Sequence, residues 1–205
     1  MKTVFFDIDT QIDFMFPAGA LYVSGAELLL PAIERLNRFA VEHGIPIVST
    51  TCAHGENDDE FKGWPVEGWP PHCVTGTPGQ LKPSSTIVGK TVVVPNHPAN
   101  IDIAGAQQII LEKQRLDLFT NPNLLPLLDK LGAEHYVVYG VVTEYCVRHA
   151  VTGLLGTGKP VTLISDAIET LNPAESDAMI AEFTERGGVV RSVQNYCQSD
   201  GFPAA

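Results

Sequence analysis

Short apolar runs of strand length alternate along this chain with longer stretches in which apolar residues recur at helical spacing. The strand-like runs lie at residues 3–9, 45–51, 91–94, 109–111, 135–142, 161–165 and 189–193. The helix-like stretches lie at residues 26–43, 121–131 and 174–186, and a further helix is expected directly after residue 142. A glycine follows each of the first three stretches, as is common at helix C-termini. The alternation predicts a single-domain α/β fold whose mostly parallel sheet carries helices on both faces.

Two internal segments and the C-terminus interrupt this alternation. Residues 52–85 are rich in Gly, Pro, Trp and charged residues and show no sustained period, which is typical of a functional loop. Residues 95–108 begin with a Pro-rich stretch, and two interpretations stay open for them: a cap over a site or a surface for self-association. Residues 198–205 predict a loose tail, so the expected domain spans residues 1–197.

The charge balance narrows the range of partners. The chain has 24 acidic and 13 basic residues, a formal net charge of −11, and no cluster of Lys or Arg, which argues against nucleic acid and anionic membrane surfaces as partners. The N-terminal residues enter a strand-like run at once, and no apolar run reaches membrane-spanning length, so we expect a cytoplasmic protein. The four cysteines lack a disulfide-framework spacing, which suits free thiols, metal ligands or core residues.

Cys146 is the first candidate for chemistry, because it follows the apolar run 135–142 at the start of an expected helix. Unpaired N–H groups and a partial positive charge at a helix N-terminus favour an ionised thiol and offer donors to an oxyanion. In a parallel sheet, ligands bind beyond the C-terminal ends of the strands, where Asp9, Cys52 and Cys146 all fall. Cys146 is therefore a candidate nucleophile, although free cysteines are also among the most buried residues.

An acidic cluster follows the first expected strand, in the segment Asp7-Ile8-Asp9-Thr10-Gln11-Ile12-Asp13-Phe14. Asp-x-Asp-x-Thr after a strand is similar to the opening motif of haloacid-dehalogenase-type phosphatases, with Asp7 as nucleophile, Asp9 as general acid and Mg²⁺ as metal. That class also needs a late pair of acidic residues, whereas this chain offers the single Asp166. The same segment resembles an Asp-x-Gln-x-Asp-Phe motif of cysteine hydrolases, in which Asp9 would be a general base.

Two further strings carry the resemblance to that second family. Residues 69–79 read Trp-Pro-Pro-His-Cys-Val-Thr-Gly-Thr-Pro-Gly, and residues 140–147 read Gly-Val-Val-Thr-Glu-Tyr-Cys-Val. Both are similar to motifs of the isochorismatase-like cysteine hydrolases, which include the nicotinamidases; the second has Glu144 where the family has Asp. The resemblance implies the Rossmann-like, three-layer α/β/α fold of that family.

The resemblance also implies a metal site in the long loop. Cys52, His54, Glu60 and His72 fall on the family's ligand positions, with Cys52 in place of the usual Asp and Glu60 in place of a frequent His. A thiolate from Cys52 would favour Zn²⁺, and Fe²⁺ or Mn²⁺ also suit the other ligands. If Cys52 turned away, three ligands and weaker binding would remain, and an acidic solvated loop is the alternative that needs no metal.

Three catalytic positions follow from the same resemblance: Asp9 as base, Lys113 as electrostatic support and Cys146 as nucleophile. Lys113 comes directly after the strand-like run 109–111, and a lysine there would stabilise both a thiolate and a carboxylate. The peptide between Val141 and Val142 would be cis, and the N–H groups of Val142 and Cys146 would form an oxyanion hole. The residues expected to contact the substrate are Phe14, Trp69, Val141 and Tyr145.

The implied activity is hydrolysis of nicotinamide to nicotinate and ammonia through a cysteine acyl-enzyme, with a divalent metal, most simply Zn²⁺, orienting the pyridine ring. The alternatives are a metal-independent amidase acting on another small amide or ureido substrate, the phosphatase that depends on Asp7, and a non-catalytic binding protein. A small-molecule amide is the expected partner. Members of the family often self-associate, so a homo-oligomer is also open.

Overall fold

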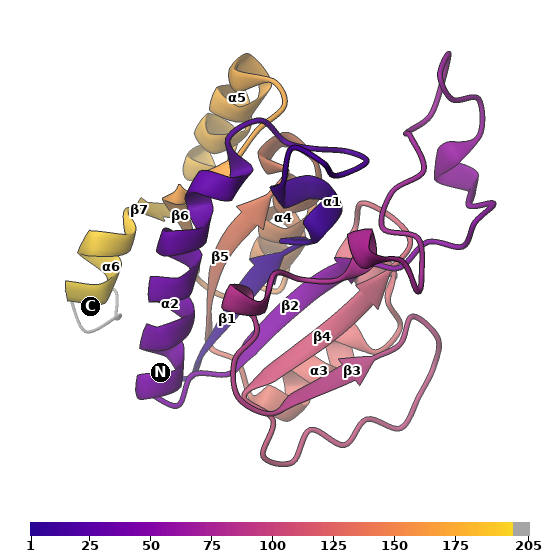
Figure 1. The fold of residues 1–205 in the computed structure, drawn as a ribbon. Helices are drawn as coiled ribbons and strands as arrows, with labels where there is room; N and C mark the ends of the chain where they lie inside the picture. The colour runs from indigo at the N-terminus through magenta and orange to yellow at the C-terminus, as the bar shows by residue number, and fades with distance from the viewer. Residues whose placement is uncertain (199–205) are drawn as a thin grey trace.

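The computed structural model describes residues 1–198 and forms one sheet of seven parallel strands in the order β3-β4-β2-β1-β5-β6-β7 (Figure 1). The strands are β1 (Thr3–Ile8), β2 (Ile47–Cys52), β3 (Thr91–Val94), β4 (Gln108–Lys113), β5 (His135–Val141), β6 (Val161–Glu169) and β7 (Val189–Arg191). The three central strands, β2, β1 and β5, are buried at every residue, and they are rich in apolar and β-branched residues, with a few buried polar side chains such as Asp7 and Ser49.

Helices cover both faces of the sheet, which gives three layers (Figure 1). One face packs on α1 (Ile12–Met15), α2 (Leu30–Glu42) and α6 (Val193–Gln198). The other packs on α3 (Leu124–Leu131), α4 (Arg148–Gly156) and α5 (Pro173–Glu185). Single turns complete the chain: η1 (Ala26–Leu29), η2 (Asp59–Phe61), η3 (Pro78–Gln80), η4 (Ser84–Thr86), η5 (Leu118–Thr120) and the π-helical η6 (Thr143–Val147). The predicted α/β class, parallel sheet and two helical layers are confirmed.

The element boundaries differ from the prediction where tertiary contacts extend or begin an element. β6 runs to Glu169 because it pairs with β5 again after a register shift at Gly140. The helix α6 was not predicted, since it is short and held by Tyr196, whose ring packs on Phe5 and Phe39. The expected tail begins at Gln198, the last residue of α6, and its remaining residues, 199–205, lie outside the described part of the chain.

The segment 95–108 is the crossover from β3 to β4, which must return along the sheet because the two strands are parallel. Ile101 and Ile103 pack against the core on the α3 face, and Lys130 donates a hydrogen bond to the carbonyl of Ile101. None of its residues lines the pocket described below. The interpretation of this segment as a cap over the site is therefore wrong.

The C-terminal ends of four neighbouring strands bring the predicted site residues together. Asp9 follows β1, Cys52 ends β2, Lys113 ends β4, and Cys146 lies in the turn after β5. Cys52 and Lys113 are directly paired in the register of β2 and β4. Parallel sheets place ligand sites beyond this edge, as was expected here.

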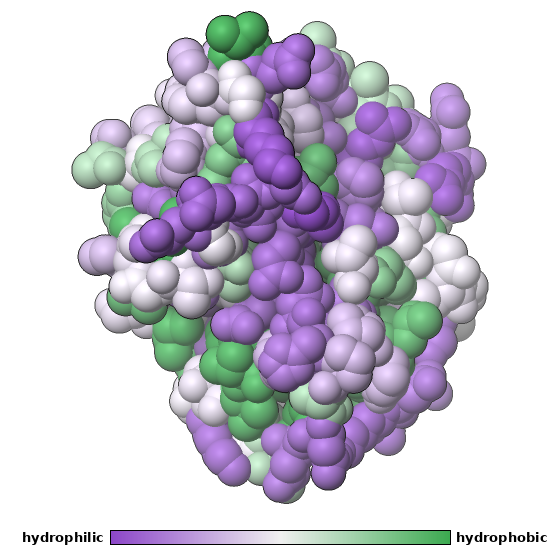
Figure 2. Space-filling view, turned by 90° about the vertical axis from the view of Figure 1, so that its right-hand side faces the viewer, coloured by the Kyte–Doolittle hydropathy of each residue, from purple (hydrophilic) through white to green (hydrophobic). Residues whose placement is uncertain are grey.

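The long connection from β2 to β3 stands away from the sheet beside this edge (Figure 1). In the space-filling view of the face that carries it, hydrophilic residues predominate and apolar residues form smaller patches (Figure 2). Within residues 1–198, no helix combines the length and the apolar character that a membrane span requires.

Candidate active site

An ion pair between Asp9 and Lys113 occupies the centre of the site. The Lys113 Nζ lies 2.8 Å from the Asp9 Oδ2, and each side chain is 1% exposed. Burial by itself would raise the pKa of Asp9, but the charge and hydrogen bond of Lys113 outweigh it and hold that pKa below its ordinary value. Asp9 also has a φ of 49°, an uncommon conformation that Asp tolerates better than most residues. Asp9 is therefore an ionised carboxylate, as a general base must be.

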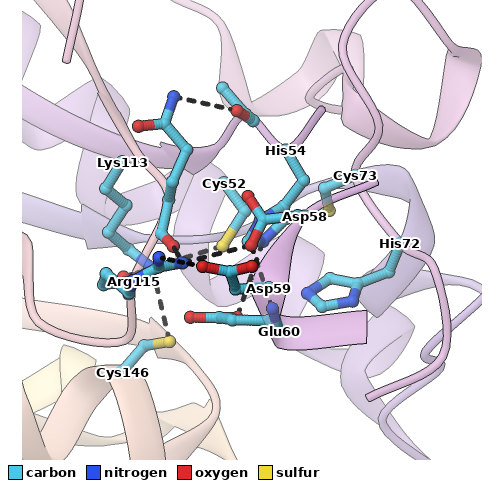
Figure 3. Close-up of polar contacts among 12 residues, drawn as sticks. Cys52, His54, Asp58, Asp59, Glu60, His72, Cys73, Lys113, Arg115 and Cys146 are labelled. Carbon is cyan, nitrogen blue, oxygen red and sulfur yellow. Dashed lines mark hydrogen bonds and ion pairs between the residues drawn. The ribbon is translucent and has the colours of Figure 1, made fainter. Parts of the chain in front are cut away.

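Cys146 lies beside this pair, with its Sγ 3.5 Å from the Lys113 Nζ (Figure 3). A hydrogen bond from the Cys146 thiol also contributes to lowering the pKa of Asp9. Cys146 sits in the π-helical turn η6 that precedes α4, not in the first turn of the α-helix itself. A hydrogen bond to Cys52 and burial raise the pKa of the Cys146 thiol, against the charge of Lys113. The expectation that the helix N-terminus ionises this thiol is thus wrong for the resting site, which holds a thiol next to a carboxylate.

The turn before Cys146 has an unusual backbone conformation, which restricts the residue that can occupy position 140. The peptide between Val141 and Val142 is cis, as predicted. Gly140 has a φ of 117°, and a Cβ at this position would lie 2.1 Å from the carbonyl oxygen of Ile8. The glycine is therefore required by the close approach of β5 to β1.

The three candidate metal ligands Cys52, His54 and His72 have ligand atoms that all lie within 4.8 Å of one another. His54 is fully buried, and within the described residues, 1–198, its Nε2 has no hydrogen-bond partner. The Nδ1 of His72 contacts the Pro70 carbonyl oxygen at 2.8 Å, and burial lowers the pKa of His72 to about 4. Two imidazoles and a sulfur are ligands that suit a divalent metal, and the buried Nε2 of His54, which has no hydrogen-bond partner within residues 1–198, is the observation that supports a metal there.

Glu60, the fourth predicted ligand, is not part of that cluster. Its Oε2 lies 3.8 Å from the Nε2 of His54, and burial raises its pKa. Asp58 is closer, with its Oδ2 3.1 Å from the Nδ1 of His54, and Arg115 in turn contacts Asp58 at 3.1 Å (Figure 3). Neither Asp58 nor Arg115 was predicted as a site residue. Asp58 lies in an acidic loop and Arg115 follows a strand, and neither position has a sequence pattern that indicates a role in a site.

A pocket of about 400 Å³, its open mouth included, joins these two groups of residues. All four predicted substrate-contact residues line it: Phe14, Trp69, Val141 and Tyr145. The rings of Trp69 and Tyr145 meet edge to face at 5.1 Å between centroids. The pocket is also lined by Asp9, Cys52, Glu60, His72, Val142 and Cys146, and by four residues that were not predicted: Leu21, Arg115, Leu116 and Leu171. Leu171 could not be predicted as a pocket residue, because the strand expected from the sequence ended at residue 165.

A protein-family profile described as the isochorismatase domain matches residues 3–195. The chain belongs to the isochorismatase family. The nicotinamidase/pyrazinamidase of Mycobacterium tuberculosis is 26% identical over 94% of this chain and 97% of that protein. An N-carbamoylsarcosine amidase from an Arthrobacter species is 24% identical over 93% of this chain and 68% of that protein. The structure of a pyrazinamidase of Pyrococcus horikoshii in complex with zinc has a TM-score of 0.78 and 27% identity, covering 94% of this chain and 99% of that one.

Membership of the isochorismatase family agrees with the position of Asp7, which does not line the pocket. Its carboxylate is fully buried, pairs with Lys82 at 2.9 Å and accepts hydrogen bonds from Thr10 and Ser49. Asp166, the late acidic residue, instead accepts the backbone N–H of Val193. Asp7 is thus enclosed in a polar network within the fold, and the phosphatase interpretation loses its nucleophile.

Proposed function

We propose that this isochorismatase-family hydrolase is an amidohydrolase that converts nicotinamide and water to nicotinate and ammonia through a cysteine acyl-enzyme. The observation that carries the proposal is the convergence of Asp9, Lys113 and Cys146, of which Asp9 and Cys146 line a pocket whose walls include aromatic rings. An ionised carboxylate next to a neutral thiol is the resting state that base-assisted attack requires. The similarity to nicotinamidase/pyrazinamidase sequences supports the choice of substrate.

The first half of the reaction forms the thioester. Asp9 takes the proton of the Cys146 thiol as the sulfur attacks the carboxamide carbon, and backbone N–H groups of Val142 and Cys146 receive the developing oxyanion. Asp9 then gives that proton to the amide nitrogen as the C–N bond breaks, and ammonia leaves. Lys113 stays protonated throughout and holds the Asp9 carboxylate in place, since burial lowers the pKa of Lys113 but its neighbour Asp9 and the two thiols raise it further.

The second half returns the enzyme to its starting state. Asp9 takes a proton from a water that attacks the thioester carbon, and the tetrahedral species collapses to nicotinic acid and the Cys146 thiolate; the acid releases its proton to give nicotinate. The proton on Asp9 then returns to that sulfur. Each turnover therefore consumes one amide and one water and leaves all three side chains as they began.

The donor set for a divalent metal would be Cys52, His54 and His72, with Glu60 as a neighbouring carboxylate. When bound, the metal would supply a Lewis acid that orients the ring nitrogen of the substrate. Phe14, whose ring centroid lies 5.3 Å from that of His72, would form a wall of the ring site next to the metal. Zn²⁺ is favoured by the thiol ligand, and a zinc complex of a related pyrazinamidase supports that choice.

A second candidate activity is metal-independent hydrolysis of another small amide or ureido compound. It keeps the roles of Asp9, Lys113 and Cys146, and the observation that favours it is Cys52 in the place of the family's carboxylate ligand. The similarity to an N-carbamoylsarcosine amidase points in the same direction. The two candidates differ in their response to a chelator.

The test is ammonia release from nicotinamide by the whole chain, measured with and without metal removal. We expect turnover that is lost in Cys146→Ala and retained in Cys197→Ala, a matched cysteine in α6 outside the site. Turnover that survives Cys146→Ala would overturn the proposal. Turnover of an N-carbamoyl compound alone, unchanged by the chelator, would replace it with the second candidate, and ring binding without turnover would indicate a binding protein.

A further inference from the structure

Glu144 has a buried carboxylate that the proposed reaction does not use. Its side chain is 6% exposed and does not line the pocket, although it is two residues from Cys146. The Oε1 accepts the backbone N–H groups of Leu171 at 2.9 Å and Asn172 at 2.8 Å. The Oε2 accepts the hydroxyl of Thr170 at 2.6 Å. Three consecutive residues of another segment are therefore held by one side chain.

The segment that Glu144 holds connects β6 to α5 and forms part of the pocket wall. Leu171 lines the pocket, yet its side chain is 41% exposed, so burial alone does little to keep it in place. Asn172 begins α5, where its side chain accepts the N–H groups of Ala174 and Glu175. The hydroxyl of Thr143 adds a further bond, to the carbonyl of Glu169 at 2.8 Å. The turn that carries the nucleophile thus also fixes one wall of the pocket.

We propose that Glu144 is a positioning residue that holds Leu171 as a wall of the pocket and so limits the size of the ring that reaches Cys146. The inference rests on the proposed amide hydrolysis. Charge-assisted hydrogen bonds to a carboxylate are short and strong, and two of these three restrain backbone N–H groups directly.

Variants of Glu144 and Leu171 distinguish a positioning role of Glu144 from a simple loss of stability. Glu144→Gln keeps the shape: its Oε1 can accept the same two backbone N–H groups, and its amide can donate to the Thr170 hydroxyl. Glu144→Ala removes all three bonds, and Leu171→Ala removes the wall itself. Glu182→Ala is the matched control, because Glu182 lies on α5 and its exposed carboxylate pairs with Arg148 outside the pocket.

The experiment compares kcat and KM for nicotinamide and for a ring-methylated nicotinamide in each variant. We expect Glu144→Ala to raise KM for nicotinamide about tenfold with kcat changed less than threefold, and to favour the bulkier substrate at least fivefold, as Leu171→Ala does. The double variant should add less than twofold to Leu171→Ala, because both changes remove the same wall. Glu144→Gln and Glu182→Ala should stay within threefold of the parent chain.

Amide hydrogen exchange gives a readout that does not depend on activity. The N–H groups of Leu171 and Asn172 should exchange at least tenfold faster in Glu144→Ala and near the parent rate in Glu144→Gln. If Glu144→Ala does not fold, Thr170→Val carries the same test at the Leu171 N–H with a smaller effect, because it removes the hydroxyl bond to Glu144 and also the bond that this hydroxyl accepts from the Asn172 N–H. Unchanged exchange in a folded variant, or additive effects of Glu144→Ala and Leu171→Ala on size selection, would overturn the inference. A parent chain that does not hydrolyse nicotinamide would refute the proposed function, while the exchange rates still decide the role of Glu144.

Discussion

The ammonium group of Lys113 lies 3.2 Å from the sulfur of Cys52, its direct partner in the register of β4 and β2. The same ammonium contacts Asp9 and Cys146, and the same sulfur belongs to the cluster with His54 and His72. Cys52 therefore does not turn away from the candidate metal site. It also joins that site to the three proposed catalytic residues, which makes Cys52 and Lys113 the residues whose replacement is most informative.

Replacement of Cys52 should change metal binding before it changes the fold. Cys52→Ala removes the only sulfur of the three-residue cluster, and we expect the affinity for Zn²⁺ to fall at least about tenfold. Cys52→Asp should bind a metal but shift the preference from Zn²⁺ towards Mn²⁺ or Fe²⁺, because a carboxylate is a harder ligand. Competition with a chromophoric chelator measures both, with Cys197→Ala as the control. Equal Zn²⁺ affinity in Cys52→Ala and the parent chain would remove Cys52 from the ligand set.

Loss of Lys113 should destabilise the fold, and loss of Asp9 in addition should restore part of that stability. Lys113→Met leaves the Asp9 carboxylate buried without its ion pair, which should lower the free energy of unfolding by about 3 kcal/mol. Asp9→Asn combined with Lys113→Met leaves no charge unpaired, so the double variant should be more stable than Lys113→Met alone. Urea unfolding followed by circular dichroism gives both values. A double variant that simply adds the two single losses would show that the pair is not energetically coupled.

Gly140→Ala should be among the most damaging single-methyl additions to this chain. The new Cβ would lie 2.1 Å from the carbonyl oxygen of Ile8, and a backbone atom in the sheet has no room to move. We expect a loss of about 3 kcal/mol or more in unfolding free energy, in the range of overpacked cores. Gly158→Ala is the matched control, since Gly158 has a φ of 76° but open space around it, and should cost about 1 kcal/mol. Similar losses at the two positions would mean that backbone conformation, not the contact with Ile8, sets the requirement.

His135 should make the fold less stable as the pH falls. It is fully buried between Thr3 and Thr162, and burial lowers its pKa to about 4. Between pH 6.5 and about 4 the unfolded chain binds this proton and the folded chain does not, so stability falls with pH in that window and not below it. His135→Gln should reduce the loss by roughly 2 kcal/mol, whereas His97→Gln, at an exposed histidine, should not. Parallel stability curves for His135→Gln and the parent chain from pH 7 to 4 would contradict this assignment.

The local sequence pattern was sufficient to predict most strands and helices and most of the candidate site residues. The strands β1, β2 and β5 could be predicted because burial on both faces favours short runs of apolar and β-branched residues, and the helices because their apolar residues repeat with the helical period. The family motifs named the four strand-end residues and the loop histidines before any contact was known. A motif specifies the order of residues along the chain, and for these positions that order was enough to identify them as candidate site residues.

The pairing of strands, the shape of the pocket and the protonation of the site residues depend on contacts between segments far apart in the sequence. The strand order places Cys52 beside Lys113, and no local pattern specifies which strands become neighbours. The same holds for Leu171, which reaches the pocket only because β6 re-pairs with β5 and Glu144 holds the loop that follows. The hydrogen bond to Cys52 and burial raise the pKa of the Cys146 thiol against the charge of Lys113, and all three depend on the tertiary structure. The sequence by itself therefore determined the fold class, the family and the candidate residues, whereas the tertiary structure decided their pairings, their charges and the shape of the pocket, because these depend on distances between segments far apart in the chain.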